Sequence, residues 1–270
     1  MHMATLLFPS IPHLTSSEKV IGLINSDLSL YIFFAILHNI VTVERMLWNV
    51  RDLSLRLLLT WIASLILMSL FVFVAAAIHL HTIIGFDEVI IAFVQGTEAP
   101  WLTAAMKAFT TIGSTGAVAL ISFASLGILL WKRRRAQAVL LVAVIGGTGI
   151  LNQVLKFIFK RERPEFHRLI DIGGYSFPSG HTMMAFSLYT ILAYIVWRNL
   201  RTSWGRAAII TAAALMILMI AVSRIYLGVH FPSDIIGGLL ASAVWVIASI
   251  AVYQRFQRKK LSIWKESGIN

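Results

Sequence analysis

The chain has 270 residues, of which 58% are hydrophobic and only 13% are charged. A soluble domain of this length carries about twice that share of charge, and the apolar residues here come in blocks near membrane-spanning length. The sequence therefore predicts an all-α, polytopic membrane protein. The chain has no cysteine, which excludes disulfides and thiolate metal sites.

The first 50 residues fit this pattern least. Their one apolar run, at 28–43, is interrupted by His38 and Asn39 and is too short for a membrane span. A basic stretch followed by an apolar core and a small-residue cleavage site, as in a signal peptide, is not evident. Met46 stands just before a basic flank and the first clear span. We interpret residues 1–50 as an N-terminal extension of undefined role, and Met46 as an alternative start.

Six apolar segments follow, and each is long enough to cross a hydrocarbon core of about 30 Å, with some flanking residues for the second and fourth. They cover residues 57–79, 115–131, 137–158, 181–198, 206–227 and 234–253. We therefore predict a six-transmembrane-helix bundle over 51–260, followed by a cytoplasmic tail at 261–270.

Short outer helices are predicted between the first two spans. In 86–94, Asp87 and Glu88 lie together and apolar residues cover the rest of the turn, which is typical of an amphipathic helix on a membrane surface. Residues 101–112 predict a second such helix, which Gly113 and its small polar neighbours separate from the second span.

The cations are distributed unevenly about the spans. Sixteen of the 23 lie in loops or ends that the positive-inside rule assigns to the cytoplasm, which leaves seven outside against seven acids. The net charge of +11 therefore lies on the cytoplasmic face, with both termini inside. This arrangement indicates membrane topology and contact with anionic lipid, and it argues against a nucleic-acid partner. The outer loop after the third span is the exception, and an anionic ligand would explain its cations: Lys156, Lys160, Arg161, Arg163 and Arg168.

Three polar clusters stand at the outer ends of different spans. They read Lys156-x6-Arg163-Pro164, Pro178-Ser179-Gly180-His181 and Ser223-Arg224-x5-His230-x3-Asp234. Ionisable groups beside membrane spans are costly, so their concentration indicates a functional site. These residue types suit one chemistry, in which a phosphate is held, attacked by histidine, and its leaving group protonated.

The cations and the helix start of these clusters favour phosphate binding. Lys156, Arg163 and Arg224 lie at or near helix C-termini, where a single cation could be purely structural. Three of them from separate segments, together with a helix N-terminus at Ser179 and Gly180, favour an anion site. Ser179 is also a natural N-cap, so the capping and phosphate roles compete for its hydroxyl.

His230 and Asp234 are four residues apart at the entry to the last span, with Pro232 suited to its first turn. This spacing can bring the carboxylate to the ring, where it would hold the tautomer and stabilise an imidazolium. With the basic clusters nearby, we interpret His230 as a nucleophile.

In this order and spacing, the clusters resemble those of the type 2 phosphatidic acid phosphatase family of membrane lipid phosphatases. The motifs cover 156–234, and the six-span layout extends the resemblance over roughly 55–255. The resemblance implies a six-helix membrane fold, an extracytoplasmic site and a reaction that needs no metal or other cofactor. It also implies a role for each motif residue: phosphate binding by Lys156, Arg163, Ser179, Gly180 and Arg224, nucleophilic attack by His230, protonation of the leaving oxygen by His181, and orientation of His230 by Asp234.

The predicted function is hydrolysis of a membrane lipid phosphomonoester or diphosphate, such as phosphatidylglycerophosphate, phosphatidate or undecaprenyl diphosphate. Phosphotransfer to an acceptor other than water would use the same residues. An anion-binding protein or transporter is a third reading, but a binder gains little from a His230–Asp234 pair, and no inverted halves are evident.

A few residues outside the motifs carry smaller predictions. Gly146, Gly147 and Gly149 predict close helix packing. Asn152 either lines the pocket or bonds a neighbouring helix, and we favour the second. Three histidines without motif support are interpreted as interfacial or loop residues: His79, His81 and His167.

Overall fold

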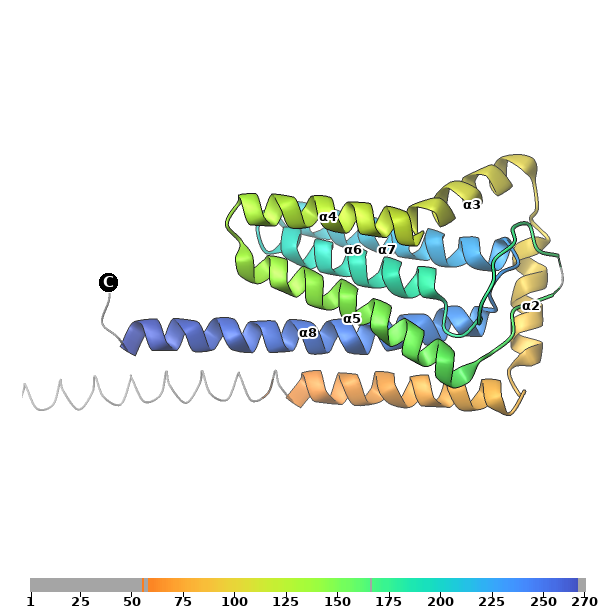
Figure 1. Ribbon diagram of the computed structural model, residues 1–270, viewed down its shortest axis with the longest axis horizontal. Helices are drawn as coiled ribbons and strands as arrows, with labels where there is room; N and C mark the ends of the chain where they lie inside the picture. The colour runs from red at the N-terminus through yellow and green to blue at the C-terminus, as the bar shows by residue number, and fades with distance from the viewer. Residues whose placement is uncertain (1–54, 56–57, 166, 267–270) are drawn as a thin grey trace, which may run out of the picture. The chain divides into compact units, whose positions relative to one another are not determined.

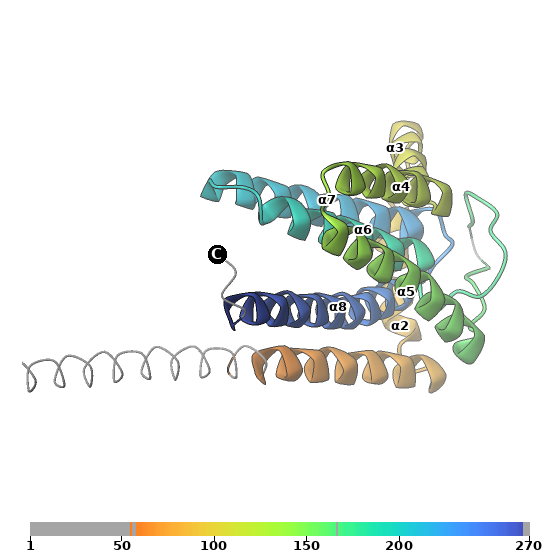
Figure 2. The same ribbon diagram turned by 60° about the vertical axis from the view of Figure 1, so that its left-hand side comes forward.

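A central helix organises the fold. This helix, α6 (Gly180–Trp197), packs on α4 (Thr115–Trp131), α5 (Arg135–Phe159), α7 (Ser203–Tyr226) and α8 (Pro232–Glu266) (Figure 1). Because it has neighbours on all sides, α6 buries apolar residues around its whole circumference, among them Leu188 and Ile191. In the view of Figure 2, α5 crosses between α4 and α8.

The structure is a computed structural model that describes residues 55, 58–165 and 167–266, and Leu59–Asn270 form one compact unit. The short run at 28–43 and Met46 lie outside the described residues. Among these described residues, five helices are long and apolar enough to cross a membrane: Leu58–His79, α5, α6, α7 and the Pro232–Arg258 part of α8. The remaining predicted span, α4, is apolar but has only 17 residues. The all-helical membrane fold predicted above is therefore confirmed, with α4 shorter than the other spans.

Two short helices precede α4, as predicted. They are α2 (Ile84–Gln95) and α3 (Pro100–Ile112), which are bent by 119° relative to each other. Pro100 occupies the first turn of α3, where its missing N–H has no helical partner. Ser114 then caps α4, since its side chain accepts a hydrogen bond from the Ala117 N–H at 3.3 Å.

The predicted packing role of the glycines holds for one of the three. A Cβ on Gly147 would collide with the Trp245 ring, so this glycine allows α5 and α8 to approach closely. A Cβ on Gly146 or Gly149 would meet nothing within 4 Å. The close-packing prediction was therefore wrong for these two residues, because their positions on α5 face open space.

The helix ends gather the motif residues at one end of the bundle. There α5 and α7 end while α6 and α8 begin, and the segment 160–179 joins α5 to α6 (Figure 1). An aromatic cluster anchors this segment, because Phe177 lies 5.9 Å from Phe71 of the Leu58–His79 helix and 4.9 Å from Phe159 of α5, centroid to centroid. Phe177 therefore anchors the end of the connection that precedes α6 against two helices.

Candidate active site

A cavity of about 880 Å³ opens at this end of the bundle. Its lining includes six of the eight residues predicted from the motifs: Lys156, Arg163, Gly180, His181, Arg224 and His230. The other two, Ser179 and Asp234, are fully buried behind its wall. The structure thus brings together residues from α5, α6, α7 and the two connecting segments.

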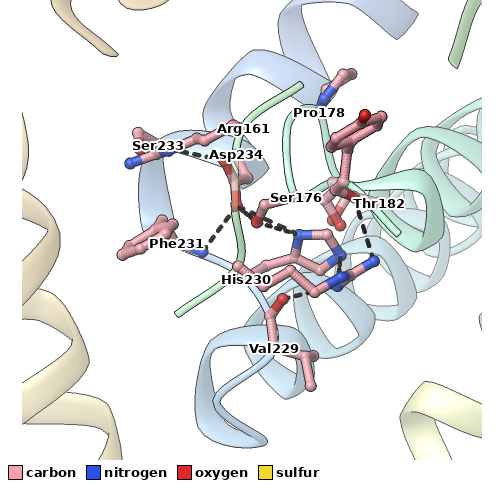
Figure 3. Close-up of polar contacts among 12 residues, drawn as sticks. Arg161, Ser176, Pro178, Thr182, Val229, His230, Phe231, Ser233 and Asp234 are labelled. Carbon is pink, nitrogen blue, oxygen red and sulfur yellow. Dashed lines mark hydrogen bonds and ion pairs between the residues drawn. The ribbon is translucent and has the colours of Figure 1, made fainter. Parts of the chain in front are cut away.

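Asp234 holds the His230 ring from the side away from the cavity. Its Oδ2 lies 3.3 Å from His230 Nδ1 and accepts a hydrogen bond from the Phe231 N–H at 2.9 Å. The Ser176 hydroxyl donates to the same carboxylate oxygen and lies 3.3 Å from His230 Nδ1 (Figure 3). Pro232 and Asp234 stand in the first turn of α8, so the helix start sets both the spacing and the direction of the carboxylate.

Arg163 lies on the other side of the ring. Its Nη1 is 3.2 Å from His230 Nε2 and donates to the Val229 carbonyl at 2.8 Å. A guanidinium has only donors, so Nε2 is the acceptor and the ring proton is assigned to Nδ1, facing Asp234. In this tautomer the Nε2 lone pair accepts from Arg163, and both residues line the cavity.

Burial lowers the pKa of both partners, which lie outside the membrane spans. Desolvation lowers the pKa of His230 to about 4, with Arg163 and Arg224 adding to the decrease and Asp234 opposing it. Burial also lowers the pKa of the Arg163 guanidinium, which Arg168 lowers further and Asp234 raises. His230 is consequently a neutral imidazole near pH 7.

Backbone carbonyls hold two of the three cations. Lys156 Nζ donates to the Tyr175 carbonyl at 2.7 Å, and Arg163 Nε donates to the Gly174 carbonyl at 2.9 Å. Gly174 has φ 77°, a left-handed conformation that glycine adopts without strain and that turns the chain here. The 173–175 segment thus forms a wall of the cavity and sets the direction of both side chains.

Arg224, the third cation, is held differently. Its side chain is buried in the last turn of α7 and donates through Nη1 to the Thr110 hydroxyl of α3. Its Nε and Nη2 are buried and have no hydrogen-bond partner among the described residues. Unpaired buried donors on a guanidinium beside a cavity are what an anion site requires.

The start of α6 forms the remaining wall. A Cβ on Gly180 would lie 3.0 Å from the Asn152 side-chain oxygen, a contact so tight that the asparagine would have to shift. Asn152 lines the cavity and also donates to Met183 Sδ of α6 at 3.1 Å, so both interpretations of this residue hold. The Ser179 hydroxyl makes no capping bond and instead accepts one from Thr182 at 3.0 Å, which keeps it behind the wall.

Comparison with known proteins identifies the family. A model of the PAP2 superfamily matches residues 137–258, which include the three clusters. Phosphatidylglycerophosphatase B of Bacillus subtilis is 34% identical over 170 residues, covering 62% of this chain and 83% of that protein. The chain belongs to the PAP2 superfamily.

Two further comparisons agree with this membership. A crystal structure described as a transmembrane PAP2 type phosphatidylglycerolphosphate phosphatase from Bacillus subtilis superposes with a TM-score of 0.65 and 29% identity, covering 73% of this chain and 96% of that one. Lipid A 4'-phosphatase of Porphyromonas gingivalis is 35% identical over 150 residues, covering 50% of this chain and 59% of that protein. The protein is thus a multi-pass membrane lipid phosphatase of the PAP2 superfamily.

The PAP2 site contains residues that the motifs did not predict. Arg161 Nη1 donates to Asp234 Oδ1 at 2.7 Å, and Arg161 Nη2 lies 2.9 Å from Asp87 Oδ2. Asp87 also accepts from the N–H and hydroxyl of Ser233, at 2.8 and 2.6 Å. The two acids of 86–94, predicted to lie together on an amphipathic helix, lie in different environments: Glu88 is exposed, but Asp87 is buried against the site. The sequence offered one signal for this ion pair: Arg161 is an outer cation that topology does not explain, and Asp87 is an acid in an otherwise apolar helix.

The histidines without motif support lie outside this PAP2 site. His167 is exposed and pairs with Glu98 at 2.6 Å, and His81 occupies a turn after the first span. Neither lines the cavity, and nor does His79. The interpretation of these residues as interfacial or loop residues agrees with their positions.

Proposed function

We propose that this PAP2 protein hydrolyses a lipid phosphate through a phosphohistidine formed on His230, without a metal. One observation carries the proposal: a buried neutral histidine lines a cavity together with three cations, its Nε2 beside Arg163 and its opposite ring nitrogen held by a carboxylate. This arrangement meets the geometric requirements of an activated nucleophile beside an anion site.

In the first step, His230 Nε2 attacks phosphorus and the bond from phosphorus to the lipid oxygen breaks. His181 donates a proton to that oxygen, so the lipid leaves as an alcohol. The phosphorylated ring carries a positive charge, which Asp234 stabilises from the Nδ1 side. The contact between Arg163 Nη1 and His230 Nε2 must break as substrate binds, because the lone pair that accepts this N–H is the one that attacks phosphorus.

In the second step, water attacks the phosphohistidine and the phosphorus–nitrogen bond breaks. His181, now neutral, takes one proton from the water, and inorganic phosphate leaves while His230 regains its lone pair. Lys156, Arg163 and Arg224 stabilise the charge on the phosphoryl oxygens in both steps, and the N–H groups at Gly180 assist them. This is the charge stabilisation that a metal supplies in other phosphoryl-transfer sites.

We further propose that the site faces the extracytoplasmic side and that both termini are cytoplasmic. The uneven distribution of cations supports this orientation. The substrate is a lipid phosphomonoester or diphosphate: phosphatidylglycerophosphate, phosphatidate or undecaprenyl diphosphate. The relatives named for phosphatidylglycerophosphate and for lipid A support a lipid phosphate over a soluble one.

The test uses purified protein in discoidal bilayers with chelator and these lipid phosphates. We expect release of free phosphate and, after a rapid quench, labelled protein whose phosphate is lost in acid and kept in alkali. His230→Ala should abolish both signals, while the matched variant His167→Ala, an exposed histidine outside the cavity, should keep them. Full activity of His230→Ala would falsify the mechanism, and label appearing in an added acceptor instead of free phosphate would indicate phosphotransfer.

A further inference from the structure

Three polar residues behind the His230–Asp234 pair form a closed ion cluster with Asp234, and the proposed chemical steps use none of the three directly: Asp87, Arg161 and Ser233. Arg161 lies between two carboxylates, that of Asp87 from α2 and that of Asp234 from α8. Figure 3 labels Arg161 and Asp234. The two carboxylates are buried and the guanidinium is mostly so, with relative side-chain exposures of 1% for Asp87, 0% for Asp234 and 14% for Arg161. Removing charged groups from water costs free energy, so a buried ion cluster beside an active site indicates a function.

The hydrogen bonds of the cluster divide the two oxygens of Asp234. Oδ1 accepts from Arg161 at 2.7 Å, which leaves Oδ2 to face His230 Nδ1, the Phe231 N–H and Ser176. Arg161 therefore fixes which carboxylate oxygen meets the ring. The Phe231 ring also packs against the guanidinium, with 4.1 Å from its centroid to Arg161 Cζ.

Asp87 in turn fixes Arg161 and the start of α8. It binds Nη2 of the guanidinium at 2.9 Å, and it accepts two hydrogen bonds from Ser233, the residue directly before Asp234. Arg161 Nη1 also donates to the Ser233 hydroxyl at 2.7 Å. The outer helix α2 is thus linked to the Asp234 carboxylate in two ways: through the Arg161 guanidinium, and through Ser233, the preceding residue in the chain.

We infer that Asp87 and Arg161 form a positioning pair that fixes the Asp234 carboxylate, and through it the ring of His230, for phosphoryl transfer. The inference rests on the proposed role of His230. Neither residue lines the cavity, so neither touches the phosphate. Their effect should therefore fall on turnover rather than on anion binding.

The variants Arg161→Lys and Asp87→Asn test this separation. Lysine keeps the charge but lacks the planar fork that bridges two carboxylates, and asparagine keeps the shape of Asp87 but not its charge. We expect each to lower kcat by about 10- to 100-fold, the usual cost of losing a partner that orients a reacting group. The affinity for vanadate should not change. The double variant should lose no more than the more severe single variant, because the two residues act as one unit.

Matched controls are Lys160→Arg and Glu88→Gln, both exposed neighbours of the pair. They should keep wild-type kcat. Wild-type kcat in Arg161→Lys and Asp87→Asn, or equal losses in kcat and vanadate affinity, would overturn the positioning role. Loss of folded protein in both variants would overturn it as well, since the cluster would then serve folding. Failure of the proposed function is distinguishable, because it would show as an inactive wild type or an active His230→Ala.

Discussion

Replacing Arg224 by methionine should weaken anion binding and yet leave the ligand-free protein close to the wild type in stability, or more stable. Arg224 is buried, with Nη1 donating to Thr110 and two nitrogens, Nε and Nη2, without a partner among the described residues. Arg161 is the natural contrast, because both of its terminal nitrogens bind carboxylates. The same substitution at these two arginines should therefore have different effects on stability.

The magnitudes follow from the count of unpaired groups. A buried donor without a partner costs about 1–3 kcal/mol, so removing two returns about 2–6 kcal/mol, against which the loss of the bond to Thr110 costs about 1.5–3 kcal/mol. The balance runs from about 1 kcal/mol destabilising to about 4.5 kcal/mol stabilising, so Arg224→Met should be close to neutral or stabilising. Arg161→Met leaves Asp87 and Asp234 buried without their cation and should cost about 3–5 kcal/mol. For anion binding, two lost charge-assisted bonds of about 1.5–3 kcal/mol each correspond to a Kd raised by roughly 10²- to 10⁴-fold.

Thermal unfolding in detergent, with and without vanadate, measures both quantities. For a chain of this size, 1 kcal/mol corresponds to about 2–4 °C in Tm, so the two variants should differ by many degrees. Vanadate should raise the Tm of the wild type but not that of Arg224→Met. If Arg224→Met lowered the Tm as much as Arg161→Met, or if vanadate still protected it fully, Arg224 would be a structural residue and the reasoning would fail.

Three further predictions concern the second histidine, pH and topology. His181→Ala should slow hydrolysis of a lipid phosphate by roughly 10²- to 10⁴-fold but that of nitrophenyl phosphate far less, since nitrophenolate leaves without a proton; equal losses on both substrates would exclude the acid role. Because the pKa of His230 is lowered to about 4, its ring should stay neutral in an NMR titration until the pH falls near 4. The unfolded chain takes up this proton near pH 6.5, so stability should be full above pH 6.5 and decline toward pH 4; a ring that titrates at or above 6.5 would contradict this. Tags after Arg134 and at the C-terminus should be protected in intact cells while a tag near Arg168 is accessible, and labelling of all three from one side would refute the orientation.

The spans and the cavity were predictable because their signals are local. A span needs only a run of apolar residues, and the ends of α5, α6, α7 and α8 carry the motif residues within a few positions of each boundary. The His230–Asp234 pair likewise depends on one helical turn, with 3.3 Å between Nδ1 and Oδ2. Six of the eight predicted residues consequently line one cavity.

The ion cluster was not predictable, because its contacts join segments far apart in the chain. Asp87 and Arg161 are 74 residues apart, and Asp87 and Ser233 are 146 apart. An apolar helix with two adjacent acids could lie on a membrane surface with either acid exposed to water. Asp87 is the buried one because Arg161 lies beside it. The side-chain position of Ser179 escaped prediction for a similar reason, since its hydroxyl bonds to Thr182 rather than capping α6.

The polar groups at this end of the bundle fall into two sets with different energetic states. In the first set, which lies behind the cavity wall, Arg161 binds both Asp87 and Asp234. In the second set, two buried donors of Arg224 have no partner among the described residues, and Arg163 donates one N–H to the lone pair of His230. A satisfied network resists rearrangement, whereas unsatisfied donors gain free energy when an anion arrives. The first set can therefore hold the His230 ring in place while the second rearranges around phosphate. Both roles need buried charged groups, which a purely apolar helix bundle would lack.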